Sequence, residues 1–247
     1  MSQKFYPIFL FGILLNMFHV SAQTLYDPET KFGLTLGATT GKISNLDLTI
    51  ISEPYFIGYR LDQTQKIGWQ GGAFVQYNIN TSAWFLYGEA SFLQQNTNLH
   101  FLNEQTSFSY DMTFKHAYAN ILGMAKVHPL IRSDTKILNG IYFAAGPHVG
   151  FIVADRIHYK SQNSLPEFGE DSYQSQQLER VLKGKTDFGM TGEIGYMIPA
   201  IRLELGLRGR YSFTDAVEAM PNSYNFIENS NKSLFWQVVL KLDLSDL

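Results

Sequence analysis

The chain has 247 residues, of which 45% are hydrophobic and 15% aromatic, and it contains no cysteine. The absence of cysteine excludes disulfide bonds and thiolate metal sites. The net charge of −3 gives no basic excess of the kind that binds nucleic acid. We therefore expect neither a disulfide-stabilised scaffold nor a nucleic-acid partner.

The first 22 residues have the organisation of a secretory signal peptide. Lys4 precedes an apolar run at Ile8–Leu15, glycine included, and Val20-Ser21-Ala22 provides a small-residue cleavage site. The run is too short for a membrane anchor, and a lipoprotein anchor is excluded because Gln23, not cysteine, follows the site. We expect a mature chain of residues 23–247 that forms one domain, with a net charge of −4 after the loss of Lys4.

Eight segments of the mature chain alternate apolar and polar residues with the period of two that is typical of β-strands. The clearest pattern starts at Ile201, where apolar residues occupy the odd positions through Leu207 while charges and glycine occupy the even ones. Strands are predicted near residues 31–40, 66–79, 84–97, 111–127, 140–158, 184–198, 201–214 and 232–244.

The connections between these segments alternate in length. The long ones are residues 41–65, 98–110, 159–183 and 215–231, and the shorter ones are 80–83, 128–139 and 199–200. Barrels of outer membranes have short turns on the periplasmic side and long external loops. We therefore predict an all-β protein, an eight-stranded antiparallel up-and-down transmembrane β-barrel with both chain ends on the short-turn side.

Glycine and charged residues share one face of the predicted strands, and large apolar residues occupy the other. The interior of an eight-stranded barrel is just wide enough to be filled by side chains, so this small and charged face is expected to point inward. Because an unpaired ion in a narrow lumen is costly, acids and bases should balance there. The predicted inward charges are Glu89, Lys126, Asp187, Glu193, Arg202, Glu204, Arg208, Arg210, Lys241 and Asp243.

All of these except the two aspartates form the predicted lumen charge network. The alternative is a set of solvated charges on the surface of a soluble sheet. Aromatic residues near strand ends could form the two girdles that mark membrane interfaces. These residues are Trp69, Tyr77, Trp84, Tyr196, Tyr211, Phe213 and Trp236.

No strong catalytic motif is present. His100 and His116 flank the 98–110 connection, near Glu104 and Asp111, but no spacing of base and nucleophile is specified. We interpret them as polar rim residues. No histidine pair has metal-ligand spacing beside a carboxylate, and no glycine-rich phosphate loop opens a helix. We therefore predict no catalytic residue, no metal and no cofactor.

Two alternatives remain open. The first is an outer-membrane rim hydrolase or acyltransferase that uses His100 or His116. The second is a soluble periplasmic barrel that binds a ligand. Recovery of the mature protein without detergent would favour this second alternative.

Several stretches carry a family resemblance. Tyr118–Lys126 is similar to a Tyr-Leu-Glu-Ile-Pro…Lys strand, with Asn120 and Leu122 at the Glu and Pro positions, and Tyr142–Phe151 contains an Ala-Gly-Pro strand motif. Asp187–Gly195 and the later Arg210-Tyr211 pair are similar to a last hairpin region. These stretches together resemble the PorT-like, OmpA-type outer-membrane β-barrel family.

The resemblance implies an integral outer-membrane barrel of a diderm bacterium with a structural or partner-binding role. In some relatives this role is accessory to a secretion or gliding apparatus. We expect a non-enzymatic monomer in the outer membrane that contacts outer-membrane lipid and meets protein partners through its long external loops.

Overall fold

The computed structural model describes the chain in several ranges. These are residues 30–51, 58–79, 83–105, 109–130, 138–161, 176, 179–180, 182–217 and 230–245. The predicted signal peptide, residues 1–22, lies outside them. Among the described residues, no helix combines the length and the apolar character needed to cross a membrane.

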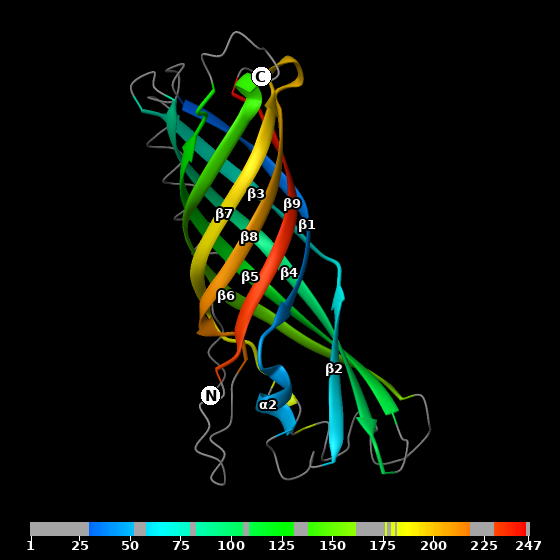
Figure 1. Cartoon of the computed structure of the whole chain (residues 1–247). Coiled ribbons are helices and arrows are strands. Elements are labelled where there is room, and N and C mark those ends of the chain that lie inside the picture. Colours follow the sequence, from blue (N-terminus) through cyan, green and yellow to red (C-terminus); the bar gives the residue numbers. More distant parts are fainter. Residues whose placement is uncertain are drawn as a thin grey trace.

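Eight antiparallel strands close into a ring (Figure 1). Each pairs with the next around the ring, and the last pairs with the first. The predicted all-β, eight-stranded, up-and-down barrel is confirmed. In ring order the strands are β1 (Thr30–Ile43), β3 (Gly68–Asn78), β4 (Trp84–Asn103), β5 (Ser109–Val127), β6 (Ile141–Ser161), β7 (Asp187–Ile198), β8 (Leu203–Asp215) and β9 (Lys232–Asp243).

The two ends of the barrel differ in their connections. The turn end carries residues 79–83, 128–140 and 199–202, including the short helices η2 (Leu138–Gly140) and η4 (Pro199–Ile201), while the loop end carries 44–58, 104–108, 162–186 and 216–231. The first and last described segments meet at the turn end, where the Leu244 amide donates to the Phe32 carbonyl over 2.8 Å.

A ninth strand, β2 (Tyr59–Lys66), extends the sheet beyond the ring at the loop end (Figure 1). It pairs with residues 96–103 of β4, on the same side of β4 that β3 occupies nearer the turn end. We call β2 together with residues 96–103, 109–116 and 155–161 the sheet extension. The short helix α2 (Leu46–Ile51) lies at the loop-end mouth beside it.

The prediction that residues 98–110 form a long loop is therefore wrong. β4 continues to Asn103 and β5 begins at Ser109, so only 104–108 connect them. The connections expected at 41–65 and 159–183 likewise contain regular structure: α2 and β2 lie in the first, and β6 runs to Ser161 in the second. The sequence shows long polar stretches there, but part of each is strand that projects past the ring.

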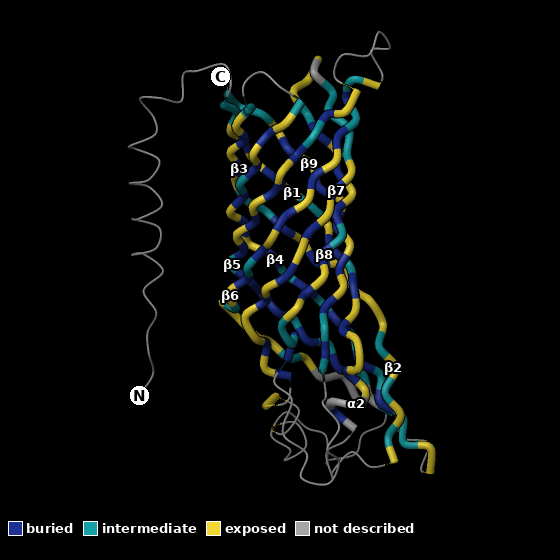
Figure 2. Tube along the Cα trace, turned by 60° about the vertical axis from the view of Figure 1, so that its left-hand side comes forward, coloured by how far each residue is buried: buried dark blue, intermediate teal, exposed yellow. Residues whose placement is uncertain are grey.

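Exposed and buried residues alternate along the strands (Figure 2). Within the ring most exposed residues are apolar, and on β8 they include Leu205, Leu207, Tyr211 and Phe213. Ten residues of strand tilted by 35–45° span about 25 Å, the height of the apolar band of a membrane barrel. Large apolar residues at least 37% exposed include Leu34, Leu36, Val75, Leu86, Phe92, Ile121, Phe143, Phe151, Phe188, Ile194, Leu207, Leu234, Val238 and Leu240.

The predicted aromatic girdle residues divide between the two ends of this belt. Three are near the turn end, namely Tyr77, Trp84 and Tyr196. The other four are near the loop end, namely Trp69, Tyr211, Phe213 and Trp236. All except Tyr196 are at least 44% exposed.

The polarity of the strands reverses in the sheet extension. Most of its inward side chains are apolar and form a buried cluster with α2 and the loop-end segments, whereas its outward positions are mostly polar. This is the ordinary arrangement of a sheet that has water on one face. The cluster comprises Ile43, Leu46, Ile50, Leu99, Phe101, Met112, Phe114, Leu182, Ala216 and Val217.

A β-bulge in β6 sits at the level of this reversal. The register between β5 and β6 shifts between Ala117 and Tyr118, which pair with Ala154 and Ile152. Val153 is therefore left without an opposite residue, and a bulge of this kind changes which face the following residues occupy. Asp155 consequently points inward, although the alternation before the bulge would have placed it outward.

Candidate functional site in the barrel interior

The ring encloses eight buried ionic side chains, four acidic and four basic among the described residues. They project inward because each occupies the face of its strand opposite the apolar belt. None is more than 8% exposed. They are Glu89 on β4, Lys126 on β5, Asp187 and Glu193 on β7, Glu204, Arg208 and Arg210 on β8, and Lys241 on β9.

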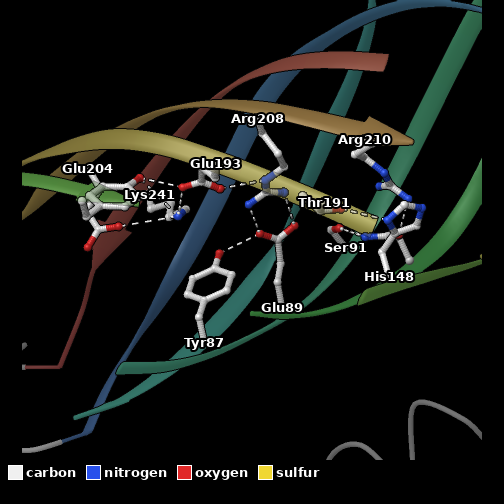
Figure 3. Close-up of polar contacts among 12 residues, drawn as sticks. Tyr87, Glu89, Ser91, His148, Thr191, Glu193, Glu204, Arg208, Arg210 and Lys241 are labelled. Carbon is white, nitrogen blue, oxygen red and sulfur yellow. Dashed lines mark hydrogen bonds and ion pairs between the residues drawn. The ribbon is translucent and has the colours of Figure 1, made fainter. Parts of the chain in front are cut away.

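Arg208 lies at the centre of this group (Figure 3). Its Nη1 and Nη2 donate to the two carboxylate oxygens of Glu89 at 3.2 and 2.9 Å, and its Nε donates to Oε2 of Glu193 at 2.8 Å. β8 and β4 are diametrically opposite in the ring of eight, so this bidentate pair spans the full lumen. Two-point binding is the strongest and most directional form that an arginine–carboxylate contact takes.

A second set of contacts continues from Glu193 toward the turn end. Lys241 contacts Oε1 of Glu193, and its Nζ lies 3.6 Å from Oε2 of Glu204. Lys126 donates to the other oxygen of Glu204 at 2.6 Å and to Oε1 of Gln76 at 2.8 Å. The chain of contacts therefore draws side chains from β3, β5, β7, β8 and β9 into one network.

A third set lies nearer the loop end. Arg210 donates to Oδ2 of Asp187 at 3.2 Å and to Oδ1 of Asn120 at 2.9 Å. The Nε2 atom of His148 lies 3.4 Å from the same aspartate oxygen, and its Nδ1 lies 2.8 Å from Oγ1 of Thr191. Figure 3 shows Arg210 and His148 beside the Arg208–Glu89 pair, one step further along the lumen.

Two tyrosines complete the carboxylate shells. The hydroxyl of Tyr87 donates to Glu89 and that of Tyr142 to Glu193, each over 2.6 Å. Their rings also face cations, with Lys126 Nζ 4.1 Å from the Tyr142 centroid and Lys241 Nζ 4.4 Å from that of Tyr87. Hydrogen bonds and ring contacts of this kind lower the cost of removing paired ions from water.

Sequence reasoning missed Tyr87 and Gln76 as members of this group. The available signal was position parity, since Tyr87 stands two residues before Glu89 on the same strand face. The alternation of the strand predicts that this tyrosine shares the charged face. It does not predict which glutamate the tyrosine contacts, because that contact depends on rotamers and on the stagger of the strands.

Of the eight predicted network residues, the structure brings seven together and places Arg202 elsewhere. Arg202 is exposed in the turn between η4 and β8, with a φ of 53°. The prediction that it points into the lumen is wrong because β8 begins only at Leu203. A residue in a left-handed turn does not follow the alternation of the strand after it. Of the two predicted inward aspartates, Asp187 is buried and Asp243 lies at the turn-end rim, contacting Lys31 at 3.4 Å.

The two candidate catalytic histidines lie on opposite faces of the sheet extension. His100 is outward and partly exposed, with Nδ1 2.8 Å from Oδ1 of Asp111. His116 is inward and buried; its Nε2 lies 3.0 Å from the Leu182 carbonyl and 3.6 Å from Asp155. They therefore do not converge on one site. Within the described ranges, no group of three or more metal-ligating side chains could hold a metal ion.

Two buried histidines lie outside the belt, one beyond each end. Burial lowers the pKa of His116, an effect that the neighbouring Asp155 opposes. Burial, with a further contribution from the nearby Lys126, lowers the pKa of His128 to about 4. Both side chains are therefore neutral at pH 7.

Comparison with known proteins gives only distant likenesses. No family model and no curated protein matches the chain. Among solved structures, the outer membrane protein OprG from Pseudomonas aeruginosa has 12% identity and a TM-score of 0.37, covering 87% of this chain and 91% of its own. Neisserial surface protein A has 15% identity and a TM-score of 0.37, with coverages of 85% and 96%.

The attachment invasion locus protein Ail of Yersinia pestis, solved with the heparin analogue sucrose octasulfate, has 11% identity and a TM-score of 0.35, with coverages of 87% and 99%. At these scores the likenesses do not assign a family or a function. The barrel assignment rests on the strand pairing of this chain.

Proposed function

We propose that this protein is an integral outer-membrane β-barrel with a sealed, non-conducting lumen and a non-enzymatic role that is carried by its loop-end surface. The polarity of the ring is the observation that carries the proposal. Between its two aromatic rims the outside is apolar and the inside holds eight ions. A barrel in water would have to expose that belt at a large cost in free energy.

The contacts across the lumen support a sealed barrel. Arg208 reaches the opposite wall, and Lys126, Glu193 and Lys241 extend the network toward the turn end. At the loop end the apolar cluster around Leu99 and Phe101 lies inside the sheet extension. A wide aqueous channel is difficult to reconcile with side chains that meet in the middle of the ring.

The rest of the proposal concerns export and partners. The mature chain, residues 23–247, is a single barrel domain exported by a signal peptide at 1–22. It acts as a monomer, because ring closure leaves no open strand edge within the belt. The resemblance to PorT-like barrels supports an accessory role in a secretion or gliding apparatus, with the partner bound at the loop end.

Two measurements test the proposal. In fractionated cells the protein should be found in the outer membrane, require detergent for extraction and change its gel mobility on heating. In planar bilayers it should give no large, stable conductance. The double variant Glu89→Ala with Arg208→Ala removes one acid and one base, and with them the span across the lumen. If it still folds, it should conduct more than the wild type.

Two results would contradict the proposal. Recovery of the mature wild-type protein from the soluble fraction would exclude the membrane location. Porin-like conductance of the wild type would exclude the sealed lumen. The double variant shows in addition whether the bilayer assay can detect an opened barrel.

A further inference from the structure

The outward face of the sheet extension carries a row of basic residues just beyond the apolar belt. Lys66 on β2 pairs in register with Asn96 on β4, Asn96 with Lys115 on β5, and Lys115 with Arg156 on β6. All four are outward positions, and Lys66 and Arg156 are exposed. With neighbouring strands about 4.8 Å apart, Lys115 and Arg156 are adjacent, and Lys66 lies about 10 Å from Lys115.

This basic row borders a shallow hollow. The hollow has a volume of about 510 Å³ and is lined by Lys66, Asn96, Thr113, Lys115 and His158. Its floor is already ordered by hydrogen bonds. Lys66 donates to Thr113 at 2.9 Å, and Asn96 bonds to the Ile67 carbonyl at 2.7 Å. The side chain of Lys66 is therefore already held in position by Thr113.

The charges in the row are not neutralised by nearby acids. In the part of the chain that the structure describes, neither Lys115 nor Arg156 forms a salt bridge, and Lys66 contacts a hydroxyl. The nearest acids on this face, Asp62 and Asp111, stand four residues further from the belt on their strands. Asp155, next to Arg156, points inward to His116.

The position of the row matches the phosphate layer of a membrane. Along β5, Lys115 is four residues beyond Ala119, which pairs with the belt residues Phe92 and Phe151. Four residues on a tilted strand rise about 10 Å. The polar region of a bilayer extends roughly 5–8 Å beyond the hydrocarbon, and long basic side chains can turn back toward it.

We propose that Lys66, Lys115 and Arg156 form a site for the phosphate groups of lipid headgroups in the outer leaflet around the loop end. The inference rests on the membrane-spanning barrel proposed above and adds a ligand class and three ligand-binding residues. The site presents a planar guanidinium fork and two point charges to one anionic group or to two neighbouring ones. A lipid bound there would hold the sheet extension against the membrane surface.

The test measures binding of diphosphoryl lipid A to the full-length mature protein in neutral detergent micelles. The triple variant Lys66→Gln, Lys115→Gln, Arg156→Gln should bind on the order of 100-fold more weakly, since each surface cation contributes several-fold to binding of anionic lipid. A matched control, Arg60→Gln, Lys183→Gln, Lys185→Gln, removes the same charge at the same end and should stay within about twofold of the wild type.

Three outcomes decide the matter. Equal binding by the row variant and the control would overturn the assignment of the site. Loss of wild-type binding on addition of equimolar inorganic phosphate would overturn the assignment to lipid. If lipid A without phosphate bound as tightly as the diphosphoryl form, phosphate recognition would be excluded. Wild-type protein that fails to insert into vesicles would instead contradict the membrane barrel itself, so the two failures are distinguishable.

Discussion

At the level of single residues, the charged side chains of the interior can stay ionised because each is paired with an opposite charge. Arg208 is fully buried and satisfies two carboxylates, and each carboxylate also accepts a tyrosine hydroxyl. A buried pair of this kind adds little net stability compared with an apolar pair of the same shape, but breaking one half leaves an uncompensated charge. The network should therefore tolerate joint replacement better than single replacement.

Arg208→Met should destabilise the folded barrel by about 3–5 kcal/mol, because Glu89 and Glu193 lose a shared partner. Combining it with Glu89→Gln should recover part of this loss. The measurement is urea unfolding followed by heat-modifiable gel mobility. Lys232→Met, which breaks a partly exposed pair with Asp215, serves as the control and should cost about 0–1 kcal/mol. Strict additivity of the two lumen replacements would show that Glu89 and Arg208 are not coupled.

His128 should make the stability of the barrel sensitive to mild acid. Its folded pKa of about 4 lies below the usual 6.5, so the unfolded chain binds the extra proton more readily. The stability that the neutral ring provides is complete above pH 6.5 and is lost as the pH falls toward 4, by roughly 3 kcal/mol. Unfolding curves at pH 7 and pH 4.5 should therefore differ less for His128→Gln than for the wild type. An unchanged difference would remove His128 from the acid response.

Along the strands, some inward positions require glycine because a neighbouring side chain leaves no room for a Cβ atom. A Cβ on Gly195 of β7 would lie 2.3 Å from the ring of Tyr142, whose hydroxyl holds Glu193. A Cβ on Gly192 of the same strand, on the outward face, would meet nothing within 4 Å. The two glycines are three residues apart and have opposite surroundings.

Gly195→Ala should thus displace Tyr142 and destabilise the barrel by about 1–3 kcal/mol, the usual cost of overpacking. Gly192→Ala, the matched control, should be neutral or slightly stabilising, because it reduces the freedom of the unfolded chain. Both are compared by urea unfolding in the same detergent. Equal effects of the two substitutions would show that the Tyr142 contact is not what requires glycine.

For the molecule as a whole, strands β4, β5 and β6 pass from the ring into the sheet extension, and the polarity of their two faces reverses on the way. In the ring, the outward face of the strands is apolar and the inward face carries the ions. Beyond Phe92 and Phe151, in the sheet extension, the outward face is mostly polar and the inward face mostly apolar. The first arrangement suits lipid and the second suits water. The point of reversal therefore marks the proposed loop-end surface of the membrane.

Leu207→Arg places a charge in the middle of the apolar run of β8, where a membrane-facing cation costs about 2–4 kcal/mol. Thr64→Arg places the same residue on the outward face of the sheet extension and should cost less than about 0.5 kcal/mol. Unfolding of both variants in lipid vesicles provides the comparison. Indistinguishable stabilities would mean that the apolar face of β8 does not contact lipid.

The pattern of the amino-acid sequence alone predicts the number of ring strands, their antiparallel order and the face of most side chains. Alternation with a period of two reports which residues share a face, and ions with glycine on one face indicate a narrow interior. That reasoning located Glu89, Lys126, Glu193, Glu204, Arg208, Arg210 and Lys241 on inward positions, where the structure also has them.

Where the apolar belt ends, and which buried ions pair with one another, depends on the folded barrel and not on local pattern. Alternation looks the same whether the apolar face is outside, as in the ring, or inside, as at Leu99 and Phe101. Residues 59–65, 98–103 and 159–161 of the sheet extension are predicted as loop from their polar sequence, although they are strand in the structure. Contacts across the lumen, such as Arg208 with Glu89, join residues 119 positions apart. They depend on ring closure and strand stagger, which no local pattern encodes. The left-handed turn at Arg202 and the bulge in β6 also change the direction of side chains, because each interrupts the alternation of its strand.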